Sequence, residues 1–428
     1  MKRILGITLL ATLSLLVLVS AKRRAIGGLP APDLDLIPER SMVVTEKAIL
    51  EAFTFERVLD QITEGSGVTS EQLFRQWWSL QTEPHCKEIL NGTERRCPTE
   101  EGALATAPYR PEDFFPIGIT NRFDQASATQ CGQYRIMFAH RKATSSEAFH
   151  VIFESELPNP RPELGLEGCR PVAQFWADLS KVDAPQGRRE RLERFFFDGV
   201  EGFPPAVHAD HFHSNQAGIR TLQLSMPHNF PSFYQFRLVR DNGTLVMKHD
   251  VLENVAFSPL MDASNADDRS NRFRQVFLEN VKNLAVRDAN LYFVKLPSEF
   301  QVQDSKPHDK YIFATNVVFF QSLSKPEGKT FEAEIAAELQ RLGSKLTPHE
   351  VVTRAETQTC IGCHFLGTPV GEGVEFPPAL DLMSHVSEQG GTATHFAMSP
   401  AMRNVFVPHR MKILKDFLIS GKAPVHSN

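Results

Sequence analysis

The segment FRLVRDNGTLVMKH, residues 236–249, decides the class of fold. Two runs of apolar, β-branched and aromatic residues flank Asp241, Asn242 and Gly243, which are residue types that favour turns. Asn and Gly adopt positive φ angles with little strain, as the tight turn of a β-hairpin requires. The segment therefore predicts two antiparallel strands joined by a short turn.

Other strand-like runs surround this hairpin between about residues 116 and 322. They carry aromatic and β-branched residues, which favour strands, and they lie at 133–139, 149–155, 219–225, 233–239 and 310–320. Segments with helical spacing interrupt them at 187–198 and 270–285. We expect an α+β domain over residues 116–324, with a central antiparallel sheet and helical inserts.

Helical patterns precede and follow this predicted sheet. Residues 45–62 have helical periodicity, and Thr69 with Gln72 forms a capping box that begins a second helix. We assign residues 22–115 to a linker and this helical segment. A small all-α domain is predicted at 325–428, with helices at 331–343, 347–358 and 409–419. The second of these helices begins with Thr347 as its N-cap and Glu350 at N3, which is the pattern of a capping box.

The first 21 residues have the form of a signal peptide. Lys2 and Arg3 precede an uncharged run from Ile4 to Val19, and small residues follow this run. The run is shorter than the ~20 apolar residues of a spanning helix, so we expect no membrane span after cleavage. An uncleaved anchor is the alternative. The mature chain is predicted to be exported, to the periplasm or the exterior of a bacterium.

Charge and cysteine content narrow the possible partners. The net charge of −5 over 428 residues disfavours nucleic-acid binding, which needs a basic surface. Export permits disulfides among the six cysteines, although the sequence does not determine their connectivity. The local spacing suggests three pairs, namely Cys86 with Cys97, Cys131 with Cys169, and Cys360 with Cys363.

The clearest chemical signal is CIGCH at residues 360–364, a C-x-x-C-H motif. In haem c attachment, Cys360 and Cys363 would form thioethers to the haem vinyl groups, and His364 would be the proximal iron ligand. The alternatives are a disulfide with an incidental histidine and a zinc site. A redox disulfide of this type should follow a strand, whereas this motif follows a predicted helix. One covalent haem c is therefore the leading hypothesis.

From this motif onward, the C-terminal segment resembles a class I cytochrome c domain. It has the same order of a helix, the motif, a proline-containing loop, the methionine segment HFAMSPAM (395–402) and a final helix. The resemblance implies that a proline carbonyl, from Pro377 or Pro378, accepts a hydrogen bond from His364. It also implies electron transfer with a redox partner protein or a small-molecule electron donor or acceptor.

The second axial ligand has several candidates. The resemblance implies a methionine from the late loop, and both Met398 and Met402 qualify. His385 would instead give bis-histidine ligation and a lower reduction potential. His395 and Met383 are further candidates, and an open position would permit ligand binding or peroxide chemistry.

A possible second metal site lies in HADHFH, residues 208–213. His208, His211 and His213, with Asp210, are residue types that bind zinc, copper or iron. The alternative is a polar loop with solvated histidines. A metal at this position would make the protein a two-centre metal and haem oxidoreductase, so the sequence leaves open whether the protein is an enzyme.

The whole chain also resembles a group of uncharacterised exported bacterial proteins. The resemblance rests on NRFD (121–124), CGQYRIMFA (131–139), LPNPRPELGLEGCRPVAQFW (157–176), TCIGCH (359–364) and FVPHR (406–410). It implies one architecture across the chain and no particular reaction. Within NRFD, Arg122 and Asp124 predict a buried ion pair or a helix cap.

Three functional hypotheses follow from the sequence. The first is an exported single-haem c-type cytochrome that transfers electrons. The second is a disulfide-stabilised exported binding or scaffold protein without haem. The third is a two-centre oxidoreductase with a metal at His208, His211 and His213.

Overall fold

The computed structural model describes residues 34–80, 89–90, 93–94, 107–141, 148–200, 202–213, 217–225, 230–250, 260–261, 265–297, 300, 328–358, 363, 368–373, 375–376 and 384–421. Several predictions fall outside these residues, among them the signal segment, the pair of Cys86 with Cys97, and the strand at 310–320.

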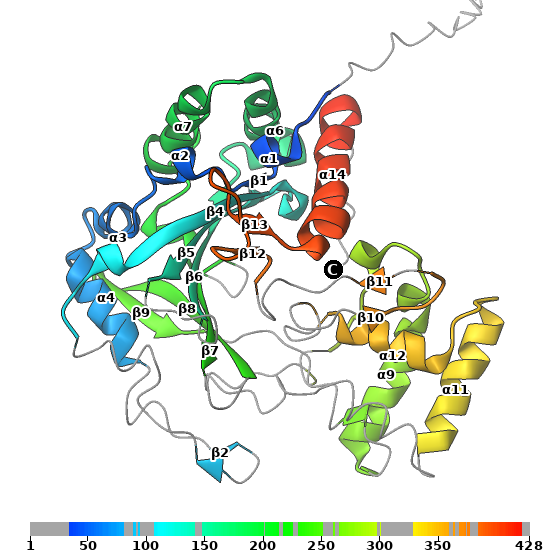
Figure 1. Cartoon of the computed structure of the whole chain (residues 1–428). Helices are drawn as coiled ribbons and strands as arrows, with labels where there is room; N and C mark the ends of the chain where they lie inside the picture. The colour runs from blue at the N-terminus through cyan, green and yellow to red at the C-terminus, as the bar shows by residue number, and fades with distance from the viewer. Residues whose placement is uncertain are drawn as a thin grey trace, which may run out of the picture. The chain divides into compact units, whose positions relative to one another are not determined.

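An antiparallel sheet of seven strands forms the centre of the fold, in the order β1-β4-β5-β6-β7-β8-β9 (Figure 1). Its strands are β1 Val43–Val44, β4 Phe114–Arg122, β5 Gln130–His140, β6 Ala148–Pro158, β7 Ile219–Ser225, β8 Phe230–Asp241 and β9 Thr244–His249. With the helices around it, this sheet makes the protein an α+β fold. The predicted strands at 133–139, 149–155, 219–225 and 233–239 are confirmed.

The hairpin of β8 and β9 has the turn that the sequence predicts. Asp241 pairs with Thr244, and the two residues between them, Asn242 and Gly243, have φ angles of 49° and 84°. Positive φ at both central positions is the geometry of a tight hairpin turn, and it explains why these two residue types stand there.

The sequence analysis missed β4, which pairs with both β1 and β5. Pro116 and Gly118 interrupt its apolar pattern, and the register with β5 shifts between these two residues. Proline cannot donate to a sheet ladder and is tolerated at such irregularities. A strand that contains a proline and a glycine within one short run is difficult to predict from its residue pattern.

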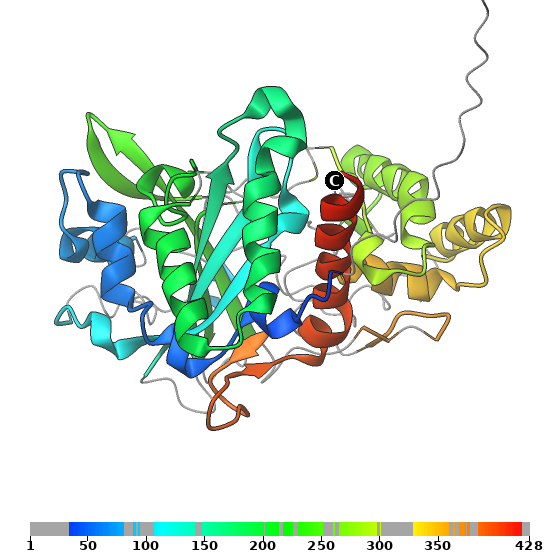
Figure 2. The same ribbon diagram turned by 90° about the horizontal axis from the view of Figure 1, so that it is seen from above.

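The two faces of the sheet differ sharply in composition. Tyr134 and Phe138 of β5 and Phe153 of β6 share one face, which aromatic side chains of the flanking helices cover. Figure 2 shows α6 (Arg170–Asp178) and α7 (Pro185–Glu193), drawn in green, side by side across the sheet. On the opposite face, Arg135 lies directly across from Glu154. Because side chains alternate along a strand, a sheet with one aromatic face can carry charges on the other.

The flanking helices are α1 Pro38–Ser41, α2 Lys47–Leu50, α3 Phe55–Thr63, α4 Ser70–Ser79, α6 Arg170–Asp178, α7 Pro185–Glu193, α9 Asp268–Leu284, α11 Gly328–Arg341, α12 Pro348–Glu356 and α14 Val407–Ser420. Helices α4, α7, α9, α11, α12 and α14 overlap helices predicted from the sequence, whereas α1 and α6 were not predicted. The capping boxes of α4 and α12 are confirmed.

One predicted helix, at 45–62, is broken into two. After α2, a new helix begins at Phe55, where the Thr54 side chain accepts a hydrogen bond from the Arg57 amide. An N-cap threonine competes with a continuous helix by satisfying an amide at a new helix start. The local cap outweighed the long-range periodicity in this segment.

Two hydrophobic cores form within the unit that begins at Leu34. The first lies around the sheet and includes Met402, Leu414 and Phe417 from the end of the chain. The second joins α9, α11 and α12. Helix α9, which precedes the predicted boundary at residue 325, belongs to the second core, and the last helix packs against the first.

The disulfide predicted between Cys131 and Cys169 is present, with Cα atoms 5.1 Å apart. It ties the start of β5 to the residue before α6. Among the described residues, no helix is long and apolar enough to cross a membrane.

Candidate functional site

Helix α12 leads directly toward the C-x-x-C-H motif and is fixed by a buried arginine. Arg354 is fully buried and donates hydrogen bonds to the carbonyl oxygens of Leu284, Val286 and Val370 at 2.6–2.8 Å. Charged donors make strong hydrogen bonds to backbone carbonyls, and they keep a buried cation solvated by the protein. The end of α12 is thereby held against the end of α9.

Cys363 is the motif residue that the structure describes; Cys360 and His364 lie outside the described residues, as do Pro377, Pro378 and Met383. Cys363 is partly buried and packs against the second core together with Phe406. Phe406 contacts the first core as well. The motif cysteine therefore lies near the place where the two cores meet.

His385 is the titratable side chain that meets Cys363. Its Nε2 atom lies 3.5 Å from the Cys363 Sγ atom, and its Nδ1 atom lies 2.9 Å from the Ser399 hydroxyl. The ring also packs edge-on against Phe406, with centroids 5.3 Å apart. Ser399 is fully buried and accepts a hydrogen bond from the Met402 amide. These contacts fix the plane of the imidazole and direct Nε2 toward the sulfur.

The other candidate axial ligands have different surroundings. Met398 lies on β13 (Ala397–Met398) and lines a cavity of about 450 Å³ beside α14, together with Val43 and Met411. Met402 is buried, and its sulfur accepts a hydrogen bond from Arg410 Nη1 at 3.7 Å. His395 pairs with Glu46 through an isolated antiparallel β-bridge of the backbone. Of the described candidates, His385 has a direct contact with the motif.

A histidine of the sheet holds the segment that carries His385. His150 of β6 is buried; its Nδ1 lies 2.7 Å from the Ser384 hydroxyl and its Nε2 lies 2.9 Å from Glu388 Oε2. Burial would raise the pKa of Glu388, but the hydrogen bond from His150 lowers this pKa below its ordinary value. Ser384 and Glu388 flank His385, so the sheet positions the imidazole from both sides.

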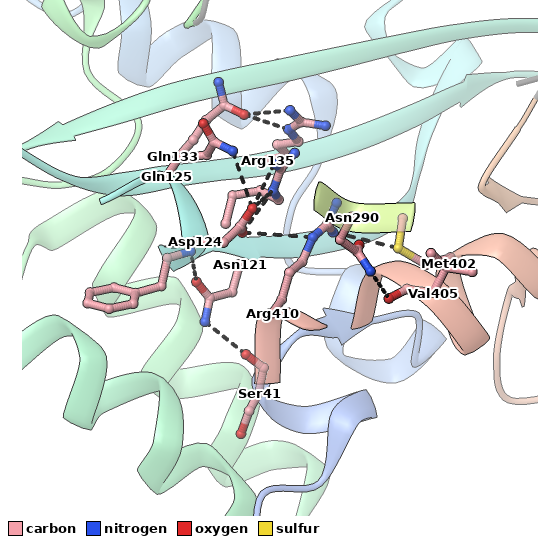
Figure 3. Close-up of polar contacts among 12 residues, drawn as sticks. Ser41, Asn121, Asp124, Gln125, Gln133, Arg135, Asn290, Met402, Val405 and Arg410 are labelled. Atoms are coloured by element: carbon pink, nitrogen blue, oxygen red, sulfur yellow. Dashed lines mark hydrogen bonds and ion pairs between the residues drawn. The ribbon is translucent and has the colours of Figure 1, made fainter. Parts of the chain in front are cut away.

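Figure 3 shows a group of buried and half-buried charged residues that includes Asp124, Arg135 and Arg410. Arg122 binds both carboxylate oxygens of Asp124, at 2.9 Å through Nε and 2.8 Å through Nη2. Arg410 of α14 approaches the same carboxylate, with Nε 3.8 Å from Oδ1. The predicted ion pair of Arg122 with Asp124 is therefore confirmed, and the structure adds Arg410 as a third member.

A second pair of arginines shares the carboxylate of Glu154. Its two oxygens lie 3.0 Å from Arg135 Nε and 2.9 Å from Arg220 Nε, and the Glu154 side chain is almost fully buried. All three residues belong to the charged face of the sheet. We call Arg122, Asp124, Arg135, Glu154, Arg220 and Arg410 the arginine cluster.

Burial and neighbouring charges shift the pKa values of three members of the arginine cluster. Burial lowers the pKa of Arg410 well below its ordinary value, and repulsion from Arg122 adds to this effect. Burial and the neighbouring arginines also lower the pKa of Arg135, to about 10, although Glu154 opposes this. Burial opposes ionisation of Asp124, but Arg122 and Arg410 hold its pKa far below the usual range.

The motif cysteine lies within electrostatic range of this cluster. Negative charge on Cys363 would raise the pKa of both Arg122 and Arg410. The sulfur, the imidazole of His385 and the guanidiniums therefore belong to one neighbourhood, assembled from the sheet, the motif and the segment before α14.

The histidines of the possible second metal site do not come together as a ligand set. His208 and His211 have ring centroids 5.1 Å apart, but His211 is buried and hydrogen-bonded through Nδ1 to the Ala206 carbonyl. Burial lowers the pKa of His211 to about 4. His213 is exposed. In the described part of the chain, no group of three or more His, Cys, Asp or Glu side chains is arranged to hold a metal ion.

Comparison with known proteins adds no assignment: no protein-family model, no curated protein and no solved structure matches this chain.

Proposed function

We propose that this chain is an exported c-type cytochrome with one covalent haem. Cys360 and Cys363 would hold the haem by thioether bonds, and His364 would be the proximal ligand. The observation that carries the proposal is the C-x-x-C-H motif, whose second cysteine lies 3.5 Å from an imidazole nitrogen of His385. When bound, such a group supplies reversible one-electron transfer.

The surroundings of Cys363 suit such a group chemically. A haem has an apolar macrocycle and two carboxylate arms, so its site needs both apolar and cationic neighbours. Cys363 packs against the second core with Phe406, and it lies within electrostatic range of Arg122 and Arg410. The donor group beside the sulfur is the imidazole of His385, which is a residue type that ligates haem iron.

His385 is the residue that we propose as the second axial ligand. Its Nδ1 is engaged by Ser399 and its Nε2 is directed toward Cys363, as expected for a ligating imidazole that is oriented through its other nitrogen. Met402 is the alternative, since it is buried near the same segment. In either case the C-terminal segment would form a cytochrome c-like unit built against the sheet.

The test of electron transfer is a reversible redox titration of the full exported chain, followed by visible absorption. We expect a one-electron transition with the absorption changes of a c-type haem. The control is the Cys360→Ala/Cys363→Ala variant, which should show no transition. A purified, folded wild-type chain with no visible absorption would reject the proposal.

A haem-free binding or scaffold protein is the second candidate function. The Cys131–Cys169 disulfide favours an exported chain that depends on disulfides for its stability. In this alternative, Cys360 and Cys363 would form another disulfide, and the same titration would show no haem transition.

A further inference from the structure

The arginine cluster contains more positive than negative charge. Even without Arg220, the three guanidiniums of Arg122, Arg135 and Arg410 contact only two carboxylates among the described residues, those of Asp124 and Glu154. Buried charges in proteins are normally paired, because an unpaired ion loses its hydration without compensation. Among the described residues, the arginine cluster therefore has an excess of positive charge. A bound group with negative charge would neutralise this excess.

Several guanidinium nitrogens of this cluster have no acceptor in the described chain. The hydrogen bonds of Arg122 use Nε and Nη2, and those of Arg135 use Nε and Nη2. The Nη1 atoms of Arg122 and Arg135 therefore make no hydrogen bond to the described residues. Arg410 is nine-tenths buried. Its one hydrogen bond to the described residues goes from Nη1 to the Met402 sulfur, which is a weak acceptor. Its Nη2 has no acceptor among the described residues.

We propose that Arg122, Arg135 and Arg410 form a binding site for an oxyanion or carboxylate group. The planar guanidinium donates paired N–H groups in a geometry that matches carboxylate, sulfate and phosphate oxygens. Three such donors come from strands β4 and β5 and helix α14, so the bound anion would join the sheet to the last helix. Asp124 keeps Arg122 and Arg410 in place, while Nη1 of Arg122 and Nη2 of Arg410 make no hydrogen bond to the described residues.

The anion could have two sources with the same chemistry. One source is a carboxylate arm of the haem proposed at Cys363, and this version rests on the proposed function. The other source is a free oxyanion from solution. The first source is consistent with the geometry, because the Arg410 guanidinium lies over the Phe406 ring, 5.6 Å from its centroid, and Phe406 packs against His385 beside Cys363. The second source needs no haem.

Thermal unfolding of the full purified chain, with sodium sulfate and with sodium chloride at matched ionic strength, tests the site. A free-anion site predicts a saturable rise in Tm that is specific to sulfate. The apparent Kd should rise about tenfold or more in Arg135→Gln and Arg410→Gln, because each loses a charged hydrogen bond. Arg403→Gln is the control, since Arg403 is exposed on the same C-terminal segment as Arg410.

A site filled by a haem carboxylate predicts a different pattern. The Tm of the wild-type chain should then show no sulfate-specific rise, whereas the Tm of the haem-free Cys360→Ala/Cys363→Ala variant should rise with sulfate. The midpoint potential of the haem is a second measurement, and it does not depend on the folding of this variant. Arg135→Gln should lower the midpoint potential, and Arg403→Gln should not.

Two results overturn the anion site. The first is the absence of a sulfate-specific rise in Tm in both forms of the chain, together with an unchanged midpoint potential in Arg135→Gln. The second is a sulfate response that Arg135→Gln and Arg410→Gln leave intact. If the chain contains no haem, the sulfate titration of the wild type decides alone, so failure of the cytochrome proposal and failure of the anion site are distinguishable.

Discussion

Cys363 and His385 bring a sulfur and an imidazole nitrogen to within 3.5 Å of each other, although they belong to different segments of the chain. Cys363 comes from the motif after α12, and His385 from a segment that Ser384 and Glu388 fix to His150 of the sheet. The contact therefore depends on both hydrophobic cores being assembled.

Replacing His385 tests its role as an axial ligand. If its Nε2 binds iron, His385→Ala should convert the visible spectrum from low-spin to high-spin, because one strong-field ligand is lost. His395→Ala is the matched control, since His395 makes its ring contact with Thr394 and should leave the spectrum unchanged. A low-spin spectrum in His385→Ala that is lost in Met402→Leu would assign the ligand to Met402 instead.

Asp124 should contribute a large, pH-dependent part of the stability. Asp124→Asn leaves Arg122 and Arg410 without their shared anion, which should cost about 3–5 kcal/mol of unfolding free energy near neutral pH. Because the pKa of Asp124 is depressed in the folded state, this contribution is present above the unfolded pKa of about 4 and is lost as pH falls below it.

Urea unfolding at several pH values measures this effect. The control is Asp183→Asn, because Asp183 pairs with Arg40 at 2.8 Å but its side chain is 94% exposed. We expect little change in the control at any pH. Equal unfolding free energies for wild type and Asp124→Asn at neutral pH would contradict the assignment of Asp124 as the anion of this cluster.

Glu356, the last residue of α12, should oppose folding at alkaline pH. Burial raises its pKa to about 9, so its folded state favours the neutral acid. A raised carboxyl pKa means that the associated stability is present below the unfolded pKa and is lost as pH rises toward the folded pKa.

The isosteric Glu356→Gln variant should therefore stabilise the chain at pH 8, by an amount on the order of 2 kcal/mol, and have little effect at pH 4. Unfolding free energies at the two pH values measure this difference. Glu334→Gln, at an exposed position of α11, serves as the control. The same stability change at both pH values would argue against a buried neutral carboxyl.

The Cys131–Cys169 disulfide closes a loop with a sequence separation of 38 residues. Loop-closure entropy gives it about 3–4 kcal/mol of stabilisation. The Cys131→Ala/Cys169→Ala variant should unfold at a lower denaturant concentration than wild type. A thiol reductant should narrow that difference by destabilising wild type alone; if the two proteins respond equally, the disulfide does not form in the exported chain.

The fold was predictable where a local pattern determines the structure. The turn at Asn242 and Gly243 was found because only a few residue types tolerate positive φ, and the cap at Thr347 because its partner lies in the next turn. Strand β4 was missed because Pro116 breaks the pattern, and the helix at 45–62 was overextended because the cap at Thr54 was not considered.

The candidate site was predictable only in part. The motif is a local signal, and NRFD correctly predicted the ion pair of Arg122 with Asp124. The contribution of Arg410 depends on α14 packing against the sheet, which no local pattern reports. A signal for the charged sheet face did exist, since Arg135 and Glu154 interrupt apolar strands, but it required the register of β5 against β6.

The mass of the intact, denatured chain tests the central claim most directly. The account predicts that the exported wild-type protein carries the added mass of one haem, which denaturation does not remove, and that Cys360→Ala/Cys363→Ala lacks it. A folded wild-type protein with the mass of the polypeptide alone, less the hydrogens lost in its disulfides, would contradict the cytochrome assignment.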